Sequence, residues 1–132
     1  MARKSGKVEV RPTAAELEIL GVLWERGPST VREVHDRLAR GRNLGYTTVL
    51  KLLQIMAEKG LVRRDESQRA HVYAARTPAE QTQRQLLGDL VERAFGGSAA
   101  LLVQQALSSR KTSAEEISRI RAYLDALEEE RR

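Results

Sequence analysis

The sequence predicts a mainly α-helical fold with one small β-hairpin and a separate helical tail. Three observations predict this fold. Apolar residues recur at helical spacing in several segments, one short stretch between residues 61 and 75 alternates as paired strands do, and a strong helix start follows at residues 77–80. The length of 132 residues suits one domain, or a small domain with an appendage.

The first two predicted helices each open with a capping box, in which a Thr and a Glu three residues later bond to each other's backbone. Thr13 and Glu16 open the first helix, which ends near Gly27, and Thr30 and Glu33 open the second. Each helix then shows one apolar face. That face consists of Leu17, Leu20, Leu23 and Trp24 in the first helix and of Val31, Val34 and Leu38 in the second.

A third helix is predicted from Tyr46 to Lys59, where Gly60 is suited to end it. After Gly60, the segments LVRRDE and RAHVYAA predict two short strands around a polar turn. Three helices followed by a hairpin are typical of a winged helix-turn-helix domain, which we assign to residues 11–76. On the third helix Val49, Leu52, Leu53 and Met56 share an inner face, and Thr47, Lys51, Gln54 and Glu58, flanked by Thr48, lie opposite.

Residues 77–132 predict three further helices. Thr77, Pro78 and Glu80 are typical of a helix start, and this helix is expected to run to about Phe95, before Gly96-Gly97. A short apolar helix follows from Ala99 to Leu107, and a last one begins at Thr112 or Ser113. The apolar residues of this tail that could pair across a dimer, or form an internal core, are Leu86, Leu87, Leu90, Val91, Leu101, Leu102, Ile117, Ile120, Leu124 and Leu127.

The positive charge is concentrated in the first part of the chain. Residues 1–76 hold 15 Lys and Arg against 9 Asp and Glu, whereas residues 77–132 hold 8 against 9. We expect residues 1–10 to form a flexible basic arm. A basic first part indicates a polyanionic partner, although scattered solvated arginines would give the same count.

Several functions find no support in the sequence. There is no cysteine, no apolar run long enough to cross a bilayer and no signal-peptide segment, so we expect a cytoplasmic protein without membrane insertion. No phosphate loop, nucleophile motif or metal-ligand cluster is visible, so we expect neither an enzyme nor a cofactor. His35 and His71 are far apart in the sequence and are read as packed or solvated side chains rather than metal ligands.

The outer face of the third helix and the hairpin form the candidate DNA-binding site. Threonine hydroxyls can bond base edges or phosphates, and their methyl groups can contact thymine. Hairpin arginines can hold phosphates along the DNA backbone. The candidate residues are Arg42, Tyr46, Thr47, Thr48, Lys51, Gln54, Arg63, Arg64 and Arg69. The alternatives are a solvated helix face and arginines that keep an edge strand soluble.

Two other functions fit the same pattern. One is a protein-interaction module built on a winged-helix scaffold, because a fold does not determine a function. The other is an architectural protein that binds DNA without sequence preference. A salt titration with operator-like and scrambled duplexes distinguishes all three.

The chain resembles the penicillinase-repressor family of bacterial winged-helix regulators over about residues 11–128. The matching segments are PTAAELEILGVLWERGPSTVREVHDRL, GYTTVLKLLQIMAEKGLVRR, RAHVYAA and AFGGSAALLVQQAL. The resemblance implies a homodimeric repressor that binds a near-palindromic operator with TACA/TGTA-like elements and dimerises through its C-terminal helices. Repression of β-lactam-resistance genes is one function that it implies.

The resemblance also implies two regulatory features that this chain matches incompletely. Family members are commonly released from DNA by proteolysis between the two domains, after a membrane-bound sensor protease detects a β-lactam. Those that are cut there carry a characteristic Asn–Phe bond. The equivalent junction here is Ala94-Phe95, without the Asn, and Gly96-Gly97 could simply break the helix. The copper-responsive branch needs clustered cysteines, which are absent from this sequence.

Overall fold

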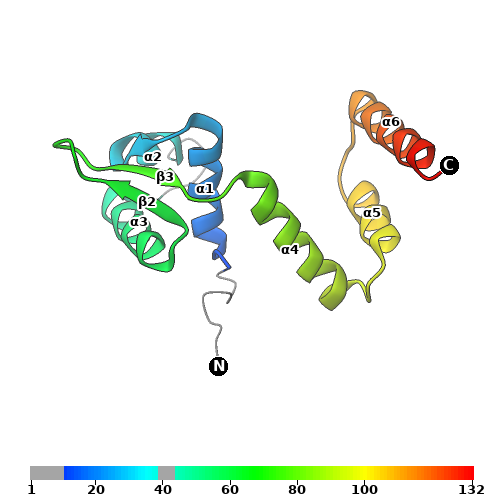
Figure 1. Cartoon of the computed structure of the whole chain (residues 1–132), viewed down its shortest axis with the longest axis horizontal. Coiled ribbons are helices and arrows are strands. Elements are labelled where there is room, and N and C mark those ends of the chain that lie inside the picture. The colour runs from blue at the N-terminus through cyan, green and yellow to red at the C-terminus, as the bar shows by residue number, and fades with distance from the viewer. Residues whose placement is uncertain (1–10, 39–43) are drawn as a thin grey trace. The chain divides into compact units, whose positions relative to one another are not determined.

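The structure is a computed structural model that describes residues 11–38 and 44–132. The chain divides into two units that meet between Leu86 and Leu87. Within the described residues, the elements follow one another as α1-β1-α2-α3-β2-β3-α4-α5-α6 (Figure 1). The prediction of a mainly α-helical chain with a small β-hairpin is confirmed. Helix α4 begins in the first unit and ends in the second, so the domain boundary at residues 76–78 stays a prediction.

Both predicted capping boxes are formed. Helix α1 (Ala14–Arg26) begins after Thr13, whose hydroxyl accepts from the Glu16 N–H at 3.2 Å, while the Glu16 carboxylate accepts from the Thr13 N–H at 2.9 Å. Helix α2 (Val31–Leu38) begins after Thr30, which makes the same two bonds with Glu33 at 3.2 and 2.9 Å. These reciprocal bonds satisfy backbone donors that the first helical turn leaves unpaired.

Helix α3 (Tyr46–Lys59) ends as the sequence predicts. Gly60 takes the left-handed conformation with φ of 85°, and the N–H of Leu61 donates to the Met56 carbonyl at 2.9 Å. A residue without a Cβ adopts this conformation without steric cost, which explains the glycine at this position. The chain therefore turns sharply from α3 into the hairpin.

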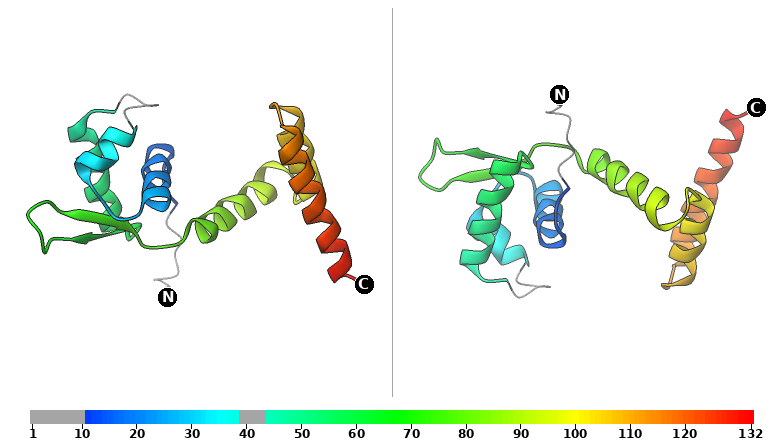
Figure 2. Two further views of the ribbon diagram at one scale, coloured as in Figure 1. Left: turned by 90° about the horizontal axis from the view of Figure 1, so that it is seen from above. Right: turned by 90° about the horizontal axis from the view of Figure 1, so that it is seen from below.

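Strands β2 (Val62–Asp65) and β3 (Val72–Ala75) form the predicted hairpin, whose tip extends past the three helices in both views of Figure 2. A third strand, β1 (Ser29–Thr30), completes an antiparallel sheet in the order β1-β3-β2. The sequence did not predict β1, because two residues give no alternating pattern and their partners, Tyr73 and Val72, lie far along the chain.

The core of the first unit lies between α1, α2, α3 and the sheet. Helix α1 buries more than the single face predicted for it, because both the other helices and strand β3 pack against it. Ile19 and Val22 are buried there, whereas Leu17 and Trp24 are only partly buried. Within residues 11–38 and 44–132, the buried apolar residues are Ile19, Leu20, Val22, Leu23, Val31, Val34, Leu38, Val49, Leu53, Met56, Val62 and Tyr73.

The first turns of α4 (Ala79–Ala94) belong to the first unit. The indole N–H of Trp24 donates to the Thr77 carbonyl at 2.9 Å, and the hydroxyls of Thr77 and Thr82 are 3.2 Å apart. Thr82 is the only buried residue of α4. The chain segment that leaves the sheet is thus bound to α1 before α4 continues.

The second unit consists of the rest of α4, α5 (Ala99–Ser108) and α6 (Ala114–Glu130). Ser98 caps α5 through the Leu101 N–H, and Ser113 caps α6 through the Glu116 N–H, which decides between the two predicted starts of the last helix. No side chain of residues 87–132 is buried. This unit therefore has no apolar core of its own within the single chain.

Candidate nucleic-acid interface

Helix α3 turns its polar face away from the core. Thr47, Thr48, Lys51 and Gln54 are exposed, while the opposite side of the helix holds the buried Val49, Leu53 and Met56 and the partly buried Leu52. Gly45, which precedes the helix, has no side chain to cap it. Among the described residues, no side chain caps the first N–H groups of α3, which lie next to two exposed threonine hydroxyls.

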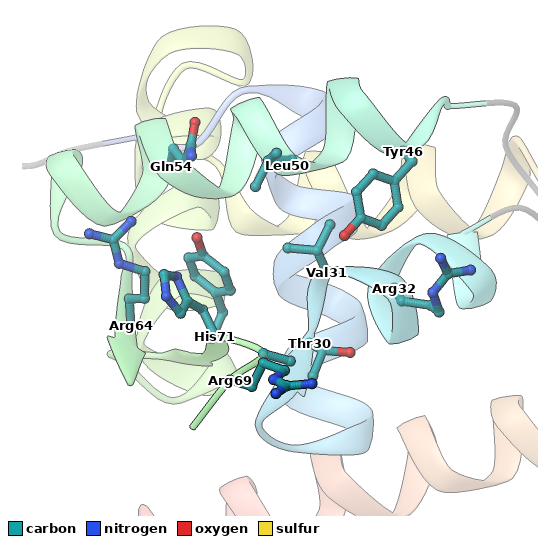
Figure 3. A pocket seen from close by; sticks show the side chains of 11 residues that line it. Thr30, Val31, Arg32, Tyr46, Leu50, Gln54, Arg64, Arg69 and His71 are labelled. Atoms are coloured by element: carbon teal, nitrogen blue, oxygen red, sulfur yellow. The ribbon is translucent and has the colours of Figure 1, made fainter. Parts of the chain in front are cut away.

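A groove of about 450 Å³ runs between α2, α3 and the hairpin (Figure 3). Arg64 and Gln54 lie toward one end of it, and Tyr46 and Arg32 lie toward the other (Figure 3). Arg69 comes from the turn between the two strands. The lining residues are Thr30, Val31, Arg32, Tyr46, Leu50, Gln54, Arg64, Arg69, Ala70, His71 and Tyr73. Three arginines from separate elements thus line the groove beside the exposed face of α3, and among residues 11–38 and 44–132 no acidic side chain lines it.

The neighbouring residues Arg63 and Arg64 point to opposite faces of the hairpin. In the β2–β3 register, Arg64 is opposite Tyr73 and Arg63 is opposite Ala74. Directly opposed residues share a face of a sheet, and successive residues alternate between faces. Arg64 therefore lies beside the buried Tyr73 on the groove side, whereas Arg63 lies on the other side and does not line the groove.

Arg64 is held in place by two partners. Its Nε lies 2.6 Å from Oε2 of Glu66, near the tip of the hairpin. A hydrogen bond with the Tyr73 hydroxyl, together with the nearby Glu66 carboxylate, raises the pKa of Arg64 further above its already high ordinary value. Among the residues that the structure describes, Lys51, Arg63 and Arg69 make no such ion pair. Arg42 lies outside the described residues.

Tyr46 connects α3 to α2. The guanidinium of Arg32 lies over its ring, 5.7 Å from the centroid, and the His35 ring meets it edge-on at a centroid distance of 6.0 Å. Arg32 was not predicted as a site residue. Arg32 follows the capping Thr30 by two positions and lies beside the buried stripe of α2. Its position at the start of that helix is the sequence signal that could have identified it as a site residue.

Two further features of the described residues concern metal binding and membrane insertion. His35 and His71 come from different elements, and no group of His, Asp and Glu able to hold a metal ion occurs in residues 11–38 and 44–132. Within the same residues, no helix is long and apolar enough to cross a membrane.

The second unit exposes much of its apolar surface. Of the residues predicted for dimerisation, Leu87, Leu90, Leu101, Leu124 and Leu127 are exposed, and Leu86, Val91, Leu102, Ile117 and Ile120 are half-buried. The structure adds Val103 and Tyr123, the latter 65% exposed. Tyr123, with Glu116, Arg119 and Ile120, lines a shallow depression on α6.

The predicted proteolysis junction lies where α4 ends. Ala94 is exposed and Phe95 is half-buried. Gly96 and Gly97 have φ of 57° and 82°, and the Gly97 N–H donates to the Val91 carbonyl at 2.8 Å. The two glycines therefore end the helix in the left-handed conformation that glycine favours.

Three helices, a hairpin and a polar helix face beside an arginine-lined groove define a winged helix-turn-helix protein. Residues 12–126 match the penicillinase repressor family. Because the match covers most of the chain, this chain belongs to that family.

Known relatives and structures are similar to parts of this chain. It is 47% identical over 60 residues to the transcriptional regulator BlaI of Mycobacterium tuberculosis, in strains H37Rv and CDC 1551 / Oshkosh. The alignment covers 45% of this chain and 44% of each relative, so it spans less than half of the relatives' length.

Among solved structures, the YusO protein from Bacillus subtilis aligns with a TM-score of 0.48 and 17% identity, over 89% of this chain and 75% of that one. A MarR family protein from Bacillus stearothermophilus aligns with a TM-score of 0.46 and 24% identity, over 89% and 74%.

Proposed function

We propose that this chain is a transcriptional repressor that binds a near-palindromic DNA operator sequence-specifically as a homodimer, in the cytoplasm. The observation that supports this proposal most is the arginine-lined groove beside the exposed polar face of α3. Membership of the penicillinase repressor family supports it independently.

In this proposal α3 reads the bases in the major groove. Thr47, Thr48 and Lys51 contact base edges and nearby phosphates, and Gln54 contacts the edge of the site, because these exposed side chains provide donors and acceptors on one helix face. Tyr46 lies at the start of this face, where it packs under Arg32. On the inner face, Val49, Leu53 and Met56 hold the helix against the core.

The arginines hold the DNA backbone. Arg64 and Arg69 contact phosphates from within the groove, and Arg63 and Arg42 provide further phosphate contacts. Phosphate contacts position the protein without reading sequence, so their loss weakens binding to all duplexes alike. Base and phosphate contacts can therefore be separated by comparing operator and scrambled DNA.

The apolar residues of the second unit pair two copies of the chain. Because residues 87–132 bury no side chain alone, a second copy would cover the exposed leucines of α4, α5 and α6. A two-fold dimer presents two α3 helices and so matches an operator with two-fold symmetry.

Selection from a library of random duplexes, followed by salt titrations, tests the proposal. We expect the selected sequences to share a near-palindrome that binds much more tightly than its scrambled version. Equal affinity for both would favour an architectural DNA-binding protein. No affinity for any duplex at low salt would remove the DNA-binding function and favour a protein-interaction module.

We further propose that repression of β-lactam-resistance or related genes is relieved when a membrane sensor protease cuts at Ala94-Phe95. The exposed Ala94 at the end of α4 supports this site, because terminal turns open more readily than helix interiors. Mass spectrometry of the chain from cells exposed to a β-lactam is expected to show fragments ending at Ala94. An intact chain while the target genes are transcribed would rule out this mode of relief.

A further inference from the structure

The hairpin contains two carboxylates next to its arginines, and they have different partners. The Asp65 carboxylate accepts from the Ser67 N–H at 2.9 Å and so stabilises the turn, a bond that also lowers the pKa of Asp65. The Glu66 carboxylate instead pairs with the Nε of Arg64 at 2.6 Å. Of these two carboxylates, Glu66 is therefore the one that neutralises a groove arginine.

The position of Glu66 matters because of the shape of a guanidinium group. Carboxylates and phosphates bind arginine best when two of their oxygens meet two parallel N–H groups, and one of the available edges includes Nε. Glu66 occupies Nε in the free chain, and Tyr73 takes a further hydrogen bond from the same side chain. A phosphate that approached this edge would meet a carboxylate of the same charge.

We propose that Glu66 is an internal competitor of DNA phosphate for Arg64 and thereby lowers the affinity of the hairpin for DNA. This inference rests on the proposed DNA-binding function and adds a residue that tunes it. In the free protein, Glu66 cancels the charge of Arg64. In the complex, a backbone phosphate replaces the Glu66 carboxylate, which turns to solvent.

The ion pair is weak enough for this exchange. Both side chains are partly exposed, 36% for Arg64 and 53% for Glu66, so the pair lies in water-like surroundings. Exposed ion pairs of this kind contribute little to stability. A DNA phosphate is surrounded by other closely spaced phosphates, so it attracts an arginine more strongly than a single carboxylate does. Arg69 lines the same groove and has no ion-pair partner among the described residues. A phosphate can therefore bind Arg69 without displacing a carboxylate.

A double-mutant cycle on the full chain tests the proposal. We expect Glu66→Gln to tighten binding to any duplex about threefold, the scale of one exposed ion pair, and to steepen the salt dependence by up to about one unit. In an Arg64→Ala background, Glu66→Gln should change affinity no more than Glu25→Gln does. Glu25 is the matched control, because it also forms an exposed ion pair with an arginine, Arg37 at 3.0 Å, and does not line the groove.

Two results would overturn the proposal. If Glu66→Gln tightened binding equally with and without Arg64, Glu66 would act only through general charge repulsion. If Glu66→Gln weakened binding, Glu66 would orient Arg64 for the phosphate rather than compete with it.

A second measurement separates this proposal from the function on which it rests. The Nε–H resonance of Arg64 can be followed by NMR during titration with inorganic pyrophosphate, which needs no operator recognition. We expect half-saturation at about threefold lower pyrophosphate in Glu66→Gln than in the wild type. Identical titrations in the two proteins would disprove competition by Glu66, even if an operator were found. A clear shift without any duplex binding would instead contradict only the proposed function.

Discussion

Lys59, the last residue of α3, pairs with Glu16 in the first turn of α1. Its Nζ lies 3.0 and 2.9 Å from the two carboxylate oxygens. Glu16 is only 2% exposed, and the same carboxylate also bonds the Thr13 N–H. One buried carboxylate therefore caps α1 and fixes the end of the helix that presents the candidate DNA-reading residues.

Removing either partner of this pair should destabilise the fold unequally. Lys59→Met leaves a buried carboxylate without its cation, whereas Glu16→Gln leaves a half-exposed lysine that water can solvate. We expect Lys59→Met to lower the free energy of unfolding by about 2 kcal/mol and Glu16→Gln to lower it by less. Urea unfolding followed by circular dichroism measures both. Equal decreases in the free energy of unfolding would show that the burial of Glu16 does not determine the loss of stability.

Arg69→Ala is expected to weaken binding to operator and scrambled duplexes by the same factor. Loss of one phosphate contact should also reduce the slope of log affinity against log salt by about one unit. Fluorescence anisotropy over a salt series measures both quantities. Arg76→Ala is the control, because Arg76 is exposed but does not line the groove. An unchanged slope for Arg69→Ala would place the hairpin turn away from DNA.

Thr47→Val should act on specificity instead. Valine keeps the shape of threonine but removes the hydroxyl that would bond a base edge, so we expect a loss of about 1–3 kcal/mol against the operator and little change against scrambled DNA. The same titrations measure the difference. Thr112→Val, in the second unit, controls for the substitution itself. If both duplexes lost affinity equally, Thr47 would be a phosphate contact.

The stability of the fold in acid should depend on Glu33. A hydrogen bond from the Thr30 backbone N–H, followed by the charge of Arg26, lowers the pKa of Glu33 below its ordinary value of 4.5. Its ionised form is therefore favoured in the folded state, so the stabilisation is complete above pH 4.5 and is lost as the pH falls through the lower folded-state value. Glu33→Gln should remove this part of the acid dependence. Urea titrations at several pH values would contradict this if both proteins lost stability in parallel below pH 4.5.

Local signals in the sequence predicted most of the fold. The capping boxes of Thr13 and Thr30 and the stop at Gly60 depend on residues within a few positions of each other, so their spacing alone specifies them. Strand β1 could not be predicted in this way. Ser29 and Thr30 become a strand only because β3 returns beside them.

Part of the candidate site was also predictable, because the helix face that it uses depends on residues a few positions apart. The helical period placed Thr47, Lys51 and Gln54 on the exposed face of α3. The groove, however, depends on how the hairpin packs beside α2 and α3. The period of a strand places Arg63 and Arg64 on opposite faces, but the sequence does not show which of the two faces the groove. It also gave no reason to add Arg32, whose relation to Tyr46 spans two helices.

The apolar surface of the second unit gives the last prediction. Leu124 is 54% exposed on α6, on the same stripe as Ile120 and Leu127. If two copies pair through this stripe, Leu124→Arg would place a charge in an apolar interface and separate them. We expect a dimer for the wild type and a monomer for Leu124→Arg by sedimentation velocity, with operator affinity falling as well, because one α3 alone reads only half of the site. Ser118→Arg, at an exposed position off the stripe, should remain dimeric. A dimeric Leu124→Arg protein would exclude this stripe as the interface. A monomeric wild type would mean that a single chain, rather than a dimer, binds the operator.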